Sequence, residues 1–192
     1  MSTIRQLVGT RDRLVALMVQ RIVARSSREG RSGQESHRKD PPVERLRALA
    51  QEEWQRYLAH PWLVEVLAST RPPLVPAVLE ASRAMVEAFV EMGFDADSAL
   101  RRYLALSGYI QGMGLLVAAE QQEAGSTGIA YGAWWADEVR RLDRTGVRRG
   151  HPWLAELTEQ PHDAGDSFDA DRAFQEGLGP ILDGLAAGAP TA

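Results

Sequence analysis

The sequence contains no cysteine, so disulfides, thiolate metal sites and cysteine nucleophiles are all excluded. Long apolar runs are also missing. The best candidate, Tyr109 to Ala119, is shorter than the roughly 18 to 20 residues that a membrane-spanning helix needs. Met1 is not followed by the charged start and apolar run of a secretory signal. These absences predict a cytoplasmic protein with no membrane partner.

Motifs for catalysis and metal binding are missing as well. The sequence has four histidines: His37, His60, His151 and His162. No two of them have the spacing that would place two metal ligands on one face of a helix. The acidic run from Asp163 to Asp171 lacks the central glycine and terminal glutamate of a calcium loop. No phosphate-cradling glycine loop and no nucleophile elbow occur. We therefore expect a protein that is not an enzyme and that uses no metal and no cofactor.

Helical periodicity runs through almost the whole chain, and no convincing alternation of strand residues interrupts it. Proline, glycine and capping residues mark the ends of the segments. The fold class that this pattern predicts is all-α, with helices at about 10–27, 41–59, 61–68, 75–92, 96–124, 127–142 and 169–187, and a short helix that begins at Pro152. The segment 96–124 is apolar around most of its circumference, which is typical of a buried helix.

Charge is unevenly distributed along the chain. Residues 1–39 carry nine basic and three acidic side chains, a net charge of +6. Residues 40–192 carry thirteen basic and twenty-three acidic side chains, a net charge of −10. The basic segment fits either a stub beside a nucleic-acid contact or a solvated linker, and charge alone leaves both interpretations open.

Three stretches together carry a resemblance to a known family. They are GTRDRLVALMVQRIV at 9–23, LRALAQEEWQRYLAHPWLVEVLASTRPPLVPAVLE at 46–80 and FDADRAFQEGLGPILDGL at 168–185. In order and spacing they resemble the linking helix, the start of the C-terminal domain and the closing helix of tetracycline-repressor-like transcriptional regulators. The resemblance implies an all-α body that binds small molecules and forms a homodimer through a four-helix bundle. Ligand binding in that family changes the spacing of two DNA-reading heads.

The same resemblance predicts the domain organisation. Residues 1–27 correspond to a remnant of the DNA-binding head with its linking helix, 28–41 to a flexible linker, and 42–192 to the ligand-binding and dimerisation domain. The family's reading head has about fifty residues before the linking helix, and only eight or nine precede it here. We expect the head to be truncated and DNA to be a partner only where a head lies upstream. A headless subunit that pairs with a complete relative and a small-molecule carrier are the alternatives.

Aromatic and methionine side chains concentrate in the central helices and predict a pocket for a small apolar or amphipathic ligand. Polar Ser107, Gln111 and Arg102 lie in or beside the apolar middle of the longest helix. Tyr109 and Met113 share one face, and Gln111 points elsewhere; we favour the first two in the pocket and Gln111 toward the dimer partner. A solid core at the same positions is the competing interpretation. The predicted lining is Trp54, Tyr57, Trp62, Met85, Phe89, Tyr109, Met113 and Trp135.

The last predicted helix carries one apolar stripe. Its residues recur at spacings of three and four and are expected to face the partner subunit across the four-helix bundle. The predicted interface residues are Phe174, Leu178, Ile181, Leu182 and Leu185.

Overall fold

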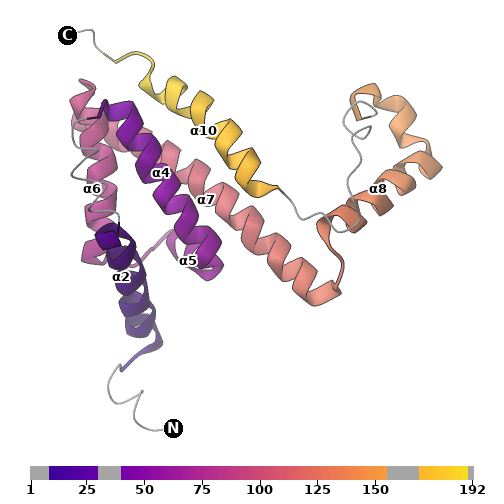
Figure 1. Cartoon of the computed structure of the whole chain (residues 1–192), viewed down its shortest axis with the longest axis horizontal. Coiled ribbons are helices and arrows are strands. Elements are labelled where there is room, and N and C mark those ends of the chain that lie inside the picture. The colour runs from indigo at the N-terminus through magenta and orange to yellow at the C-terminus, as the bar shows by residue number, and fades with distance from the viewer. Residues whose placement is uncertain (1–8, 30–39, 155–168, 190–192) are drawn as a thin grey trace. The chain divides into compact units, whose positions relative to one another are not determined.

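The computed structural model describes residues 9–29, 40–154 and 169–189, and helices account for nearly all of them (Figure 1). The elements follow the order α2 (Arg11–Glu29), α4 (Pro42–Ala59), α5 (Pro61–Leu67), α6 (Pro76–Glu91), α7 (Ala96–Thr127), α8 (Tyr131–Thr145), the short 3-10 helix η1 (Val147–Gly150) and α10 (Ala170–Ala186). The described ranges contain no β-strand, and the predicted all-α class is confirmed. Most of the predicted linker lies outside the described residues.

The chain divides into two compact units. The first comprises Met1–Leu115 with Arg172–Ala192, and the second comprises Leu116–Asp171. Helix α7 begins in the first unit and ends in the second. In the described ranges no helix combines the length and the apolar composition needed to cross a bilayer.

Local capping explains where several helices begin and end. The Thr10 hydroxyl accepts the backbone N–H of Arg13 at 3.2 Å, and the Asp95 carboxylate accepts the backbone N–H of Ser98 at 2.8 Å. After α6 the chain turns at Gly93, whose φ of 96° favours glycine. Helix α4 begins at Pro42, one residue later than Asp40–Pro41 predicts, because Pro41 takes the N-cap position.

An aromatic stack forms the centre of the first unit. The Trp54 and Phe174 rings lie 4.5 Å apart, and the Phe174 and Tyr109 rings lie 5.6 Å apart, both nearly parallel. This stack joins α4, α10 and α7, which also run side by side in Figure 1. The largest fully buried side chains around it are Leu46, Leu63, Met85, Phe89, Leu106, Ile110, Leu178 and Leu182.

Helix α7 has one buried face and one exposed face within a single chain. On the buried face, a Cβ at Gly114 would lie 3.1 Å from side-chain atoms of Tyr57 and Val64, so glycine permits the close approach of α4 and α5. The exposed face includes Ala105, Gly108, Gly112 and Leu115 at spacings of three and four. The prediction that the apolar helix is buried all round is therefore wrong for the single chain.

The second unit contains its own aromatic group on α8. The Tyr131 and Trp134 rings lie 5.5 Å apart, and the Trp134 and Trp135 rings lie 6.0 Å apart. Helix α8 ends at Gly146 in the left-handed conformation, with φ of 73°. Arg148 of η1 then pairs with Asp143 at 3.1 Å. These contacts order the end of α8.

Candidate ligand-binding cavity

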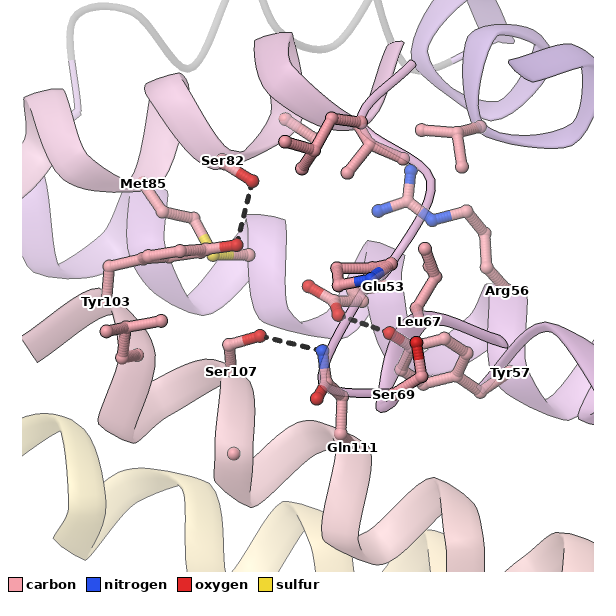
Figure 2. A pocket seen from close by; sticks show the side chains of 17 residues that line it. Glu53, Arg56, Tyr57, Leu67, Ser69, Ser82, Met85, Tyr103, Ser107 and Gln111 are labelled. Atoms are coloured by element: carbon pink, nitrogen blue, oxygen red, sulfur yellow. Dashed lines mark hydrogen bonds between the residues drawn. The ribbon is translucent and has the colours of Figure 1, made fainter. Parts of the chain in front are cut away.

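A cavity of about 330 Å³ lies inside the first unit, which is within the size range of small-molecule sites (Figure 2). Five helices and the segment between α5 and α6 form its walls. The lining residues are Val23 of α2; Glu53, Arg56 and Tyr57 of α4; Leu67 of α5; Ser69, Pro72 and Leu74; Val78, Ala81, Ser82 and Met85 of α6; and Tyr103, Leu104, Ser107, Gly108 and Gln111 of α7.

Three hydrogen bonds organise the polar side chains of this cavity, and all three are drawn in Figure 2. The Tyr57 hydroxyl donates to Glu53 Oε1 at 2.6 Å, within α4. The Ser82 and Tyr103 hydroxyls share a hydrogen bond of 2.7 Å between α6 and α7.

The third hydrogen bond lies within α7, where Gln111 Nε2 donates to Ser107 Oγ at 3.1 Å. Figure 2 shows the polar ends of Glu53, Tyr57, Ser107 and Gln111 gathered on one side of the cavity. A ligand with an apolar body and one polar end matches this division.

Burial sets the electrostatics of the α4 wall. It raises the pKa of the Glu53 carboxyl above its ordinary value, although the Tyr57 hydrogen bond and the Arg56 charge oppose the shift. Burial also raises the pKa of the Tyr57 hydroxyl, so this group is a proton donor at neutral pH. Arg56 is 8% exposed, and its Nη1 donates to Glu52 Oε1 at 3.2 Å. In the described ranges no three His, Asp or Glu side chains gather closely enough to hold a metal ion.

The structure brings two of the eight predicted ligand-binding residues, Tyr57 and Met85, into the cavity lining. It places Trp54, Phe89 and Tyr109 elsewhere. Trp54 and Phe89 are 0% exposed and pack in the core, outside the cavity lining. At these positions the interpretation as solid core describes the structure, because large flat rings fill the space between tightly packed helices.

Trp62 and Met113 are half-buried and also lie outside the lining. Trp135 is half-buried on α8 and belongs to the second unit.

The favoured orientation of α7 is reversed. The Tyr109 hydroxyl donates to the carbonyl of Phe174 at 2.8 Å, so its ring faces α10. Gly177 leaves the space for it, since a Cβ there would lie 2.3 Å from the Tyr109 hydroxyl oxygen. Residues two apart on a helix point to nearly opposite sides, so Gln111 faces the cavity.

Three of the five predicted interface residues are also placed inside the chain's own core. Phe174 and Leu178 are 0% exposed and Leu182 is 1% exposed, so none of them can contact a partner while the protomer stays folded. They face inward because α10 uses its most apolar stripe to cover α4 and α7. Ile181 and Leu185 are half-buried, and for them the interface assignment stays a prediction.

Sequence reasoning missed several lining residues, Glu53 above all. Glu53 lies four residues before Tyr57 and three after Ala50, on the apolar face of α4. A carboxylate on the buried face of an amphipathic helix is the signal that identifies it. Tyr103 and Ser82 carry no comparable signal, because their hydrogen bond joins two helices that only tertiary packing brings together.

Comparison with known proteins identifies the family. The model of the tetracyclin repressor-like C-terminal domain matches residues 38–188, which is most of the chain. The chain belongs to this family. The tetracyclin repressor-like domain is 29% identical over 140 residues to the HTH-type transcriptional repressor DrrR1 of Streptomyces coeruleorubidus, and that alignment covers 73% of this chain. The chain spans about half the length of this curated relative, of which the alignment covers 50%.

A solved structure shares the fold. It is a transcriptional regulator described as a TetR from Streptomyces coelicolor, which superposes with a TM-score of 0.70. The match covers 98% of this chain and 82% of that one, at 20% sequence identity. The tetracyclin repressor-like fold assigned from sequence is therefore confirmed.

Proposed function

We propose that this chain is the ligand-sensing and dimerisation body of a transcriptional regulator of the tetracycline-repressor type. The observation that carries the proposal is the position of the cavity against α2, to which Val23 contributes. Helix α2 resembles the family's linking helix, which joins body and DNA-reading head. A ligand in the cavity therefore touches the element through which binding can reach DNA.

Helix α6 provides a second connection between cavity and α2. Four of its residues line the cavity, and its first turn is held by α2 through a hydrogen bond from Ala77 N–H to Gln20 Oε1 at 2.9 Å. A ligand that moves α6 therefore acts on α2 as well. Such a shift requires that the ligand bind two conformations with different affinity, typically a difference of about 1–3 kcal/mol.

A thermal-shift screen with amphipathic aromatic compounds tests ligand binding. A compound that binds only the folded state adds about 2.7 kcal/mol of stability at a hundred times its dissociation constant. Ala81→Trp fills the cavity and should abolish this gain, whereas Ala59→Trp at an exposed position of α4 should preserve it. If both variants respond like the wild type, the compound binds elsewhere and the cavity is not the sensor site.

Hydrogen exchange distinguishes a sensor from a carrier. In a sensor, the bound compound should change the protection of backbone amides in α2 as well as those in α6. A carrier that uses the same cavity would show changes confined to the lining of α4, α6 and α7. An unchanged α2 at saturating ligand would contradict the regulatory proposal while leaving ligand binding intact.

We also propose that the domain forms a homodimer through α7 and α10. The support is the exposed face of α7, where Leu115 is 40% exposed and a Cβ at Gly112 would meet no atom within 4 Å. Small residues allow a second helix to approach closely, and exposed leucine provides apolar area to bury. Ile181 and Leu185 of α10 are the proposed contribution of the last helix. In this proposal DNA is a partner only where a helix-turn-helix head lies upstream of α2.

A further inference from the structure

The charged side chains on the α4 wall of the cavity do not balance. Arg56 pairs with Glu52, and Glu53 receives its hydrogen bond from the neutral hydroxyl of Tyr57. With all three groups ionised, Glu52, Glu53 and Arg56 sum to a charge of −1. Arg56 is the only Arg, Lys or His among the seventeen lining residues, all of which lie in the described part of the chain.

Of the two carboxylates, Glu53 lines the cavity and Glu52, the partner of Arg56, does not. The Glu53 side chain lines the cavity together with Tyr57 and Gln111, and the opposite helix contributes apolar Val78 and Met85 (Figure 2). A carboxylate removed from water is costly unless a cation and hydrogen bonds compensate it. Tyr57 supplies one hydrogen bond, and Arg56, the one cation of the lining, is paired with Glu52.

We infer that the cavity selects an organic cation, with a protonated amine that pairs with Glu53 and an apolar body that packs against Val78 and Met85. The inference rests on the proposed function, because it concerns the ligand of the same cavity. A cation brings the charge of the α4 cluster from −1 to zero, whereas an anion brings it to −2. In a cavity of low polarity this difference favours the cation strongly.

Gln111 supports the same ligand class. Its amide nitrogen donates to Ser107, so the nitrogen is already engaged and the amide oxygen is the group left to accept a hydrogen bond. An ammonium group carries several N–H donors and can use both the Glu53 carboxylate and the Gln111 oxygen.

The ionisation of Glu53 gives the inference a second consequence. On α4 itself, the titratable and charged groups around Glu53 are Tyr57, Arg56 and Glu52. Among the lining residues of the facing helices, the titratable group is Tyr103 of α7. Because burial raises the pKa of Glu53, this carboxyl takes up its proton at a higher pH than a solvent-exposed glutamate does. A cation binds the ionised form, so binding releases a proton in the pH range where Glu53 titrates, and the affinity falls as the pH is lowered.

Three probes of nearly equal shape test the inference on the full chain. They are biphenyl-4-ylmethylamine, biphenyl-4-ylmethanol and biphenyl-4-carboxylate, with charges of about +1, 0 and −1 at neutral pH. Titration calorimetry should show the amine binding about tenfold more tightly than the alcohol, and the carboxylate most weakly. In the pH range where the affinity of the amine falls, buffers of different ionisation enthalpy should show that the amine releases protons and the alcohol does not.

Glu53→Gln separates the charge from the shape of the site, because glutamine can still accept the Tyr57 hydrogen bond. The amine should lose about tenfold in affinity in this variant, and the alcohol should change less than about twofold. Glu65→Gln is the matched control, since it removes one carboxylate from an exposed position on α5 and should leave all three probes unaffected.

The relative affinities of the three probes distinguish between the possible ligand classes. If the alcohol binds and the amine is no tighter, or if Glu53→Gln weakens both equally, the inference is overturned and the proposed ligand site survives. If the carboxylate binds best, Arg56 recognises the ligand and the cavity selects anions. If none of the three probes binds, the proposed ligand site and the inferred ligand class fall together.

Discussion

Gln20 on α2 holds the first turn of α6 by accepting a hydrogen bond from the backbone N–H of Ala77 at 2.9 Å. The first N–H groups of a helix have no partner inside the helix, and α6 has no side-chain cap of its own at Val75. A side chain 57 residues away in sequence therefore performs the capping. The contact joins α2 to a wall of the proposed ligand cavity.

Gln20→Ala should destabilise the domain by about 1 kcal/mol, the usual cost of losing a helix cap. The reason is that the Ala77 N–H is left without its acceptor at a partly buried position. Urea unfolding followed by circular dichroism measures the change. Gln55→Ala, at an exposed position of α4, is the matched control and should stay within about 0.5 kcal/mol of the wild type. Equal stability of the two variants would show that the cap contributes nothing.

Gly177→Ala should destabilise the domain by about 1–3 kcal/mol, because the new methyl group overlaps the Tyr109 hydroxyl. The ring has little freedom to move, since it stacks on Phe174 and its hydroxyl donates to the Phe174 carbonyl. Gly184→Ala on the same helix meets no atom within 4 Å and should be neutral or stabilising by up to about 1 kcal/mol.

A double-mutant cycle tests the cause of this effect. In a Tyr109→Phe background the hydroxyl is gone, so most of the cost of Gly177→Ala should disappear. The variant Tyr109→Phe alone should lose about 1 kcal/mol with its hydrogen bond. A cost for Gly177→Ala that is the same in both backgrounds would show that the two residues do not compete for space.

Glu53→Gln should become more stable relative to the wild type as the pH rises. The folded-state pKa of Glu53 is raised above the model value of 4.5, so the stability that the neutral carboxyl contributes is complete below that value. This stability is lost as the pH rises through the folded-state pKa of Glu53. The glutamine side chain does not titrate, so the variant does not lose stability in this way.

Urea unfolding of both proteins between pH 4.5 and 8 gives the comparison. Equal urea dependence of the two proteins shows that both unfold the same surface. A stability difference that is constant with pH would mean that Glu53 titrates alike in the folded and unfolded states.

Gly112→Arg should convert the proposed dimer into a folded monomer. The position is exposed on α7 and a side chain there meets no atom of its own chain, so the fold should survive. A large arginine side chain on this face prevents a second helix from approaching closely, and burying its charge in an interface costs free energy. Size-exclusion chromatography with light scattering measures the mass. Val90→Arg, at an exposed position of α6, should leave the dimer intact. If the wild-type protein is itself monomeric, the proposed homodimer is wrong.

The sequence by itself determined which segments are helical and the family, although α7 ends at Thr127 and α8 begins at Tyr131, each a few residues later than predicted. Periodicity, prolines and glycines are local signals, because a helix of 3.6 residues per turn marks its buried face within a few turns. The capping pair Asp95 and Ser98 and the turn at Gly93 follow from neighbouring residues alone. The apolar stripe on the last helix was also visible in the sequence.

Only the tertiary structure decided what each buried face contacts. The stripe around Phe174 and Leu178 serves the chain's own core, although its spacing fits a dimer interface equally well. Tyr109 and Gln111 could be exchanged between core and cavity until the hydrogen bond to Phe174 and the space beside Gly177 settled the orientation of α7. Periodicity identifies a face as apolar, but the identity of its neighbour depends on packing between distant segments, which no local pattern encodes.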